Sequence, residues 1–159
     1  RVGVDTLTAA LASFERKLVS LDSLYDRGVL PETAEAGRKM FFASGCAECH
    51  KPPYFTDDAF HRVRAPAPDE SDGGLADATG RAEDRGLFRT PPLRNVAVTF
   101  PYWHDGRART LADAIALHET PAPPRETAEI VAFLESLTDA NFLGDPRFSL
   151  PPASCPAAE

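Results

Sequence analysis

The sequence predicts one compact, mainly α-helical domain that also contains long ordered loops. Of its 159 residues, 43% are apolar, which is enough for a single domain with a hydrophobic core. Apolar side chains recur at helical spacing in separate segments. The 15 prolines and 10 glycines are too many for a plain helical bundle and predict the loops. We therefore expect residues 1–159 to form one domain.

Two helices are expected in the first third of the chain. Residues 6–21 read TLTAALASFERKLVSL and place five apolar side chains on one helical face, namely Leu7, Leu11, Phe14, Leu18 and Leu21. Pro31 stands at a first-turn position of the next helix, because its fixed φ suits a helix start. That helix is predicted to continue through AEAGRKMFFAS to residue 44.

The remaining helices are expected after a long irregular segment. Residues 51–109 hold most of the Pro, Gly and Asp and show no sustained periodicity, so they predict an ordered wrap with at most one short helix. Thr110 caps a helix over 110–120, with Asp113 at the capping-box position. The segment from Pro121 to Pro124 ends it, a last helix follows over 126–137, and the tail from Asp139 is expected to be a loop.

A short motif carries the strongest chemical signal. Residues 45–50 read GCAECH, and the order Cys46-x-x-Cys49-His50 is the specific signature of covalent c-type haem attachment. Two thiols must reach two vinyl groups on one porphyrin edge, and the next residue must bring its imidazole to the iron. A zinc site would need two further ligands at finger-like spacing, whereas the next histidine is His61 and no second C-x-x-C exists. Zinc, a redox dithiol and chance remain the alternatives.

Covalent haem predicts assembly outside the cytoplasm, normally in the bacterial periplasm. There, Cys155 has no partner in this chain. An exposed tail thiol is favoured over a disulfide to another polypeptide. Arg1 opens directly onto helix-forming sequence, so we expect a mature or cleaved product without a signal peptide.

Composition excludes two classes of partner. The net charge of −7 leaves no basic stripe for nucleic-acid phosphates. No run of 18 apolar residues is present, so no membrane span is predicted.

The iron of such a haem needs a second ligand, for which the chain offers several candidates: Met40, His61, His104, His118, Tyr54 and Tyr102. Met40 lies on the helix that enters the motif, which ties it to the side of His50. His118 shares a helix face with Leu111, Ala114 and Ile115 and is therefore predicted to point inward. A hydrogen-bonded core histidine is the alternative.

Several longer stretches resemble the C-terminal haem domain of bacterial di-haem cytochrome c peroxidases and their MauG-like relatives. They are ALASFERKLVSLDSLYDRG, PPYFTDDAFHRV, GLFRTPPLRNVAVTFPYWHDGRARTLADAIALH and EIVAFLESLTD. The resemblance runs over roughly residues 8 to 148, and the tail LTDANFLGDPRF is closer to the MauG-like branch. It implies a cytochrome c-like haem domain with long ordered loops and one covalent haem c per chain.

The resemblance also implies roles by position. Cys46 and Cys49 match the thioether cysteines and His50 the proximal ligand. His118 stands at the distal position, where peroxidases have methionine and MauG-like enzymes typically tyrosine. The backbone carbonyls of Thr99 and Pro101 match positions that bind a calcium ion between two haems, and oxygen ligands suit that ion.

Four further residues are candidates with two interpretations each. Arg89 and Arg94 would bind the haem propionates or form surface ion pairs. Trp103 would relay oxidising equivalents, although packing against the haem is favoured. His104, with the Asp beside it, would make a polar contact near the haem edge or anchor a turn.

The predicted function is that of a haem domain which exchanges electrons with a peroxide-reacting haem outside this chain. That haem is implied to lie in an N-terminal domain, with the catalytic residues outside this chain. The reaction would be peroxide-dependent oxidation of a protein or small donor, and the partners would be the second haem domain and that electron donor or protein substrate. A stand-alone mono-haem electron carrier is the main alternative, and a mono-haem enzyme with an open iron site is a third.

Overall fold

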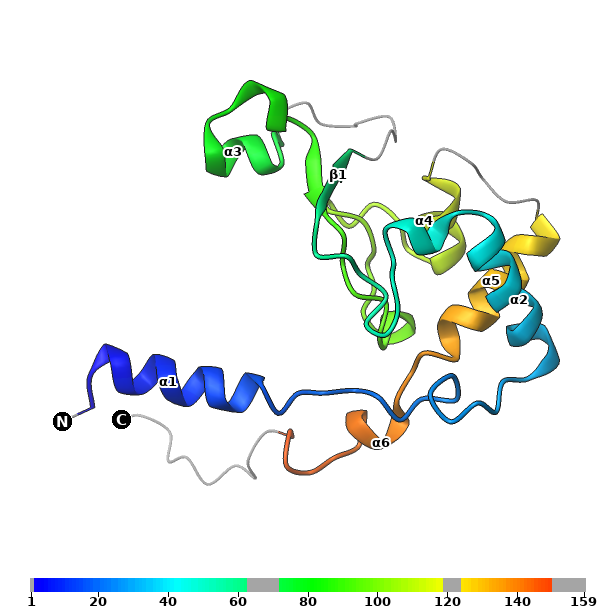
Figure 1. Cartoon of the computed structure of the whole chain (residues 1–159), viewed down its shortest axis with the longest axis horizontal. Coiled ribbons are helices and arrows are strands. Elements are labelled where there is room, and N and C mark those ends of the chain that lie inside the picture. The colour runs from blue at the N-terminus through cyan, green and yellow to red at the C-terminus, as the bar shows by residue number, and fades with distance from the viewer. Residues whose placement is uncertain (1, 63–71, 119–123, 150–159) are drawn as a thin grey trace.

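The computed structural model describes residues 2–62, 72–118 and 124–149. Figure 1 shows the arrangement of its elements. In chain order they are α1 (Val4–Glu15), α2 (Glu32–Ala43), the 3-10 turn η1 (Cys46–Glu48), β1 (Phe60–Arg62), α3 (Leu75–Thr79), η2 (Ala82–Asp84), β2 (Leu87–Arg89), η3 (Val96–Val98), α4 (Leu111–Ala116), α5 (Pro124–Glu135) and α6 (Ala140–Leu143). Helices dominate the described residues, so the predicted mainly α fold class is confirmed.

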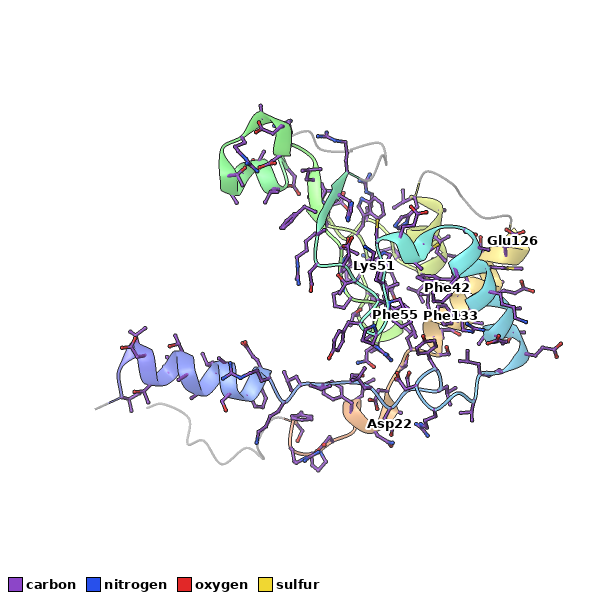
Figure 2. The ribbon with its side chains drawn as sticks, in the orientation of Figure 1. Asp22, Phe42, Lys51, Phe55, Glu126 and Phe133 are labelled. Atoms are coloured by element: carbon purple, nitrogen blue, oxygen red, sulfur yellow. The ribbon has the colours of Figure 1, made fainter. Side chains whose placement is uncertain are left out.

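The hydrophobic core forms where α2 packs against α5. Three aromatic rings meet there with centroids 5.2 to 6.0 Å apart: Phe41 of α2, Phe133 of α5 and Phe55 of the loop between η1 and β1. Figure 2 shows Phe55 and Phe133 next to each other in the middle of the main body. The other buried members of this core are Leu93, Val96, Leu111, Ile130, Leu134 and Leu137. Because α2 ends at Ala43, this packing fixes the point at which the cysteine motif begins.

The first helix is shorter than its apolar pattern predicts. α1 ends at Glu15, whereas the pattern continues to residue 21. Beyond Glu15, the chain forms hydrogen bonds with residues far along the sequence. Ser20 Oγ accepts from Asn95 Nδ2 over 2.9 Å, and the Asp22 N–H donates to Asp139 Oδ2 over 3.0 Å. Bonds to residues distant in sequence replace the hydrogen bonds of a further helical turn. α1 projects away from the main body in Figure 1.

Two predictions about helix ends have opposite outcomes. The capping box of α4 is confirmed: Thr110 Oγ1 accepts from the Asp113 N–H, and Asp113 Oδ2 accepts from the Thr110 N–H, both over 3.0 Å. The tail was expected to be a loop from Asp139, and this is wrong for its first turn. Asp139 caps the one-turn helix α6 by accepting from the Phe142 N–H over 2.9 Å.

The described residues between 51 and 109 are mostly loop, as expected, but they contain more short elements than the single predicted helix. β1 and β2 pair antiparallel, with His61 opposite Phe88. Strands of three residues are too short to show an alternating pattern. No helix among the described residues is both long and apolar enough to span a bilayer. Cys155 lies outside the described residues.

Candidate haem site

The cysteine motif folds into a single tight turn. Gly45 enters it with φ of +79°, a left-handed conformation that glycine adopts without steric cost. The Glu48 N–H then donates to the Gly45 carbonyl over 2.9 Å, and the His50 N–H to the Cys46 carbonyl over 3.0 Å. This turn brings Cys46, Cys49 and His50 together at the end of α2.

Both thiols of the motif are half-buried and are not joined to each other by a disulfide. Burial raises the pKa of the Cys46 thiol. Burial also raises the pKa of Cys49, and the nearby carboxylates of Asp57 and Glu48 raise it further. The two groups are therefore neutral thiols at pH 7, the reduced form from which a thioether to a vinyl group is made.

His50 is held in the tautomer that a metal ligand requires. Its Nδ1 lies 3.0 Å from the carbonyl oxygen of fully buried Phe55. A carbonyl can only accept, so Nδ1 carries the proton and Nε2 carries the lone pair. Burial lowers the pKa of His50, which keeps the ring neutral. A backbone bond to the second ring nitrogen is the usual support of a ligating histidine.

The Nδ1 of His118 is also bound to a backbone carbonyl, although His118 does not lie where the helix pattern places it. α4 ends at Ala116, so His118 lies in the turn beyond the helix and its side chain is exposed rather than inside the core. Its Nδ1 lies 2.8 Å from the Ala114 carbonyl oxygen, which again leaves Nε2 with the lone pair. His118 also lowers the pKa of His50, after the larger effect of burial. The two imidazoles are thus within electrostatic reach of each other.

Residues 102–108 form a hairpin beside His118, which we name the Trp103 hairpin. Tyr102 and Ala108 close it by exchanging two backbone hydrogen bonds. The Trp103 ring meets the His118 ring edge to face, with centroids 5.2 Å apart and planes at 90°. The Trp103 Nε1–H is buried and has no hydrogen-bond partner among the described residues.

His104 of the same hairpin makes its contacts outside its own turn. Its ring stacks on Phe88 with centroids 3.9 Å apart, and Nδ1 lies 3.0 Å from Asp72 Oδ2. These contacts tie the Trp103 hairpin to β2 and to the residues before α3.

The two arginines considered for the propionates have protein partners in the structure. Arg94 donates through Nε to the Pro53 carbonyl and through both terminal nitrogens to Asp26, over 2.6 to 2.8 Å. Arg89 pairs with Asp58 at the surface. A propionate would have to displace Asp26 to bind Arg94, and the propionate roles stay predictions.

Thr99 and Pro101 are exposed between η3 and the Trp103 hairpin, where their calcium role also stays a prediction.

One cluster near the motif was missed by the sequence patterns. Ligand atoms of Cys49, Asp57 and His61 lie within 4.8 Å of one another, and His61 Nε2 is 2.8 Å from Asp57 Oδ2. The hydrogen bond from His61 is the largest cause that lowers the pKa of Asp57 to about 2. This set omits Cys46 and His50, so a metal bound there would use only part of the motif.

As a whole, these residues fit a covalently bound haem c. Two neutral thiols and His50 share one turn, and His118, whose Nδ1 is also bound to a backbone carbonyl, lies within electrostatic reach of His50. The buried indole N–H of Trp103 offers a donor that the described protein atoms do not use. Met40, in contrast, packs against the core from α2.

Known proteins are similar to this chain in sequence and in fold. The chain is 35% identical, over 94% of its length, to cytochrome c551 peroxidase from Nitrosomonas europaea, covering 48% of that protein. It is 34% identical, over 86% of its length, to the methylamine utilization protein MauG from Methylorubrum extorquens, covering 45% of it. A MauG-like protein associated with microbial copper homeostasis has a crystal structure that matches with a TM-score of 0.82 at 29% identity, over 94% of this chain and 61% of that one. No protein-family model matches the chain.

The chain spans about half the length of the curated relatives it matches. Both peroxidases and MauG proteins match it over most of its residues, at 30–35% identity. The sequence resemblance and the solved structure thus agree. The chain belongs to the family of bacterial di-haem cytochrome c peroxidases and MauG-like proteins.

Proposed function

We propose that this chain is a c-type haem domain of a di-haem peroxidase/MauG-like oxidoreductase. Its haem exchanges electrons with a peroxide-reacting haem outside this chain, during peroxide-dependent oxidation of a protein or a small donor. The observation that carries the proposal is the pair of imidazoles, His50 and His118. Each ties Nδ1 to a backbone carbonyl, over 3.0 and 2.8 Å, and each keeps the lone pair of Nε2 for iron.

The cysteine motif would hold one haem per chain. Cys46 and Cys49 would each form a thioether bond to a vinyl group, and His50 would bind the iron from the same side. The haem supplies reversible one-electron oxidation and reduction. Because such attachment takes place outside the cytoplasm, the proposal includes a periplasmic location.

A histidine at position 118 has a consequence for the potential. Methionine sulfur raises the potential of a haem, so an imidazole in its place gives a lower value. A low potential favours the oxidised iron. This suits a domain that stabilises oxidising equivalents more than one that collects electrons from a high-potential donor.

The exposed apolar face of α1 is consistent with a second haem domain as the partner of this chain. Its apolar residues Leu7, Leu11 and Phe14 are 53%, 51% and 47% exposed, and they follow one another at helical spacing. Such a continuous apolar face marks an interaction surface. The matched relatives are about twice as long as this chain. We infer that the α1 face contacts the second haem domain, and that Thr99 and Pro101 offer carbonyls to a calcium ion shared with it.

Haem stoichiometry and reactivity test this function. In the native particle, pyridine haemochrome against protein mass should give one haem on each 17.2 kDa chain and a second haem on the partner domain. The haem of this chain alone should be low-spin and unreactive to peroxide. A single haem per native particle would make this chain a stand-alone electron carrier instead. A high-spin haem that consumes peroxide unaided would make it an open-site enzyme.

One cysteine variant and one histidine variant together separate a haem site from a zinc site. The cluster of Cys49, Asp57 and His61 does not include Cys46. Cys46→Ser should therefore remove one thioether and shift the haemochrome band, whereas a zinc site of those three residues would survive it. His61→Ala should leave haem attachment intact. Zinc bound stoichiometrically to the native protein, and lost in His61→Ala, would overturn the haem assignment.

A further inference from the structure

We propose that Trp103 is a positioning residue for His118: its indole fixes the plane of the imidazole and thereby sets how readily His118 leaves the haem iron. This inference rests on the proposed function, in which His118 is the second iron ligand. It adds a residue of the Trp103 hairpin that binds neither iron nor substrate.

The backbone of Trp103 is held in an unfavourable conformation. Its φ is +77°, in the left-handed region that a bulky aromatic residue rarely adopts. Tyr102 and Ala108 impose this conformation through backbone hydrogen bonds of 2.8 and 3.3 Å, together with a bond of 3.2 Å from the Gly106 N–H to the Trp103 carbonyl. Strain of this kind persists where the surrounding structure enforces it, and it concentrates at functional sites.

The strained residue is also the one whose ring meets His118. The two rings lie edge to face, with centroids 5.2 Å apart and planes at 90°, which is a preferred aromatic geometry. The guanidinium carbon of Arg107 lies 5.6 Å from the centroid of the same indole. Backbone and cation together fix the indole, and the indole then restricts the imidazole.

His118 needs such a restraint because its own anchoring is weak. It lies beyond the last residue of α4, Ala116, and its side chain is exposed. The hydrogen bond from Nδ1 to the Ala114 carbonyl fixes the tautomer but permits the ring to turn about that bond. The perpendicular indole opposes this rotation, so Nε2 keeps one direction.

Two other roles of Trp103 predict different behaviour. An indole that merely packs against the haem would change haem uptake or stability without changing the rate at which His118 is displaced. An indole that relays electrons would change electron-transfer rates without changing the orientation of the ligand. The exchange rate and the ligand plane therefore distinguish positioning from both.

The experiment uses the haem-loaded protein and two readouts besides activity. The first is the rate at which cyanide displaces the distal ligand from the ferric haem, and the second is the set of EPR g-values, which report the orientation of the axial imidazoles. Trp103→Ala should raise the displacement rate about three- to tenfold and shift the g-values, the effect expected for the loss of one aromatic pair. Trp103→Phe keeps an aromatic edge and should restore most of the wild-type behaviour.

A distant aromatic residue provides the control. Phe148 packs against Phe14 and Phe142, so Phe148→Ala should leave both readouts unchanged. If Trp103→Ala takes up no haem, Trp103→Leu keeps a larger apolar side chain than alanine without an aromatic edge, and the same results are expected from it.

Failure of the inference and failure of the proposed function look different. If His118→Ala abolishes the low-spin spectrum but Trp103→Ala and Trp103→Leu match the wild type in both readouts, the positioning role is wrong and the ligand assignment stands. If His118→Ala leaves the spectrum unchanged, the ligand assignment itself is wrong, and the role of Trp103 falls with it.

Discussion

Gly37 of α2 lies directly against the backbone carbonyl of Glu129 in α5: a Cβ atom at residue 37 would be 1.8 Å from that oxygen. The absence of a side chain therefore lets the two helices approach closely. Since α2 leads into the cysteine motif, this contact determines where Cys46, Cys49 and His50 stand relative to the rest of the core.

Gly37→Ala should consequently force α2 away from α5. We expect a loss of about 1–3 kcal/mol in the free energy of unfolding, the usual cost of overpacking, and reduced haem incorporation. Urea denaturation and the haem-to-protein ratio measure the two effects. Gly3→Ala is the matched control, because nothing lies within 4 Å of a Cβ at that position. Equal stability of both variants would show that the helices do not meet at Gly37.

Arg94 should act on stability rather than on haem binding alone. The side chain of Arg94 is 7% exposed and pairs with the side chain of Asp26, which is 16% exposed. Because the Asp26 residue lies at the surface, Arg94→Ala removes the hydrogen bonds of Arg94 to Asp26 and to the Pro53 carbonyl rather than leaving a fully buried charge, and it should cost about 1.5–3 kcal/mol. Arg147→Ala breaks an ion pair whose arginine is 79% exposed and should cost less than about 1 kcal/mol. Denaturation of the haem-free protein decides whether Arg94 stabilises the fold or binds a propionate. A loss of stability confined to the haem-loaded form would assign Arg94 to a propionate.

The same ion pair gives a pH dependence with a definite sign. Burial would raise the pKa of Asp26, but Arg94 and Ser23 bind the ionised carboxylate and lower that pKa below its ordinary 3.8. The stabilisation is present above pH 3.8 and is lost as the pH falls through the lower, folded-state pKa. The difference in unfolding free energy between wild type and Arg94→Ala should therefore be larger at pH 7 than in acid. A difference independent of pH would contradict the ionised pair.

Asp57 offers a direct titration. Its hydrogen bond from His61 lowers its pKa to about 2. His61→Ala removes that bond, so the pKa of Asp57 should rise toward 3.8, as followed by NMR of the carboxyl carbon. His104→Ala removes a histidine–carboxylate contact at Asp72 instead and should not move Asp57. An unchanged Asp57 pKa in His61→Ala would mean that the pair does not form.

Local patterns predicted the parts of the structure that local interactions determine. The capping box at Thr110 and Asp113 and the two core helices follow from spacing within one segment. The end of α1 does not, because residue 20 accepts a hydrogen bond from Asn95 and residue 22 donates one to Asp139, both far along the chain. The strands β1 and β2 are too short to show a period.

In the candidate site, too, local sequence patterns predicted some features and missed the contacts between distant residues. The haem motif is contiguous, so Cys46, Cys49 and His50 could be read from six residues. His118 was predicted from a helix face that ends before it, since α4 stops at Ala116, and its role as an iron ligand stays a prediction. The exposed His118 ring and the strained Trp103 meet through a hairpin contact that no spacing rule describes.

The spin state of the ferric haem in His118→Ala tests the central claim most directly. If His50 and His118 are the two ligands, the wild type is low-spin, His118→Ala is high-spin and binds cyanide faster, and His118→Met stays six-coordinate with a higher potential. His61→Ala serves as the control histidine and should keep the wild-type spectrum. A low-spin spectrum that is unchanged in His118→Ala would contradict the account.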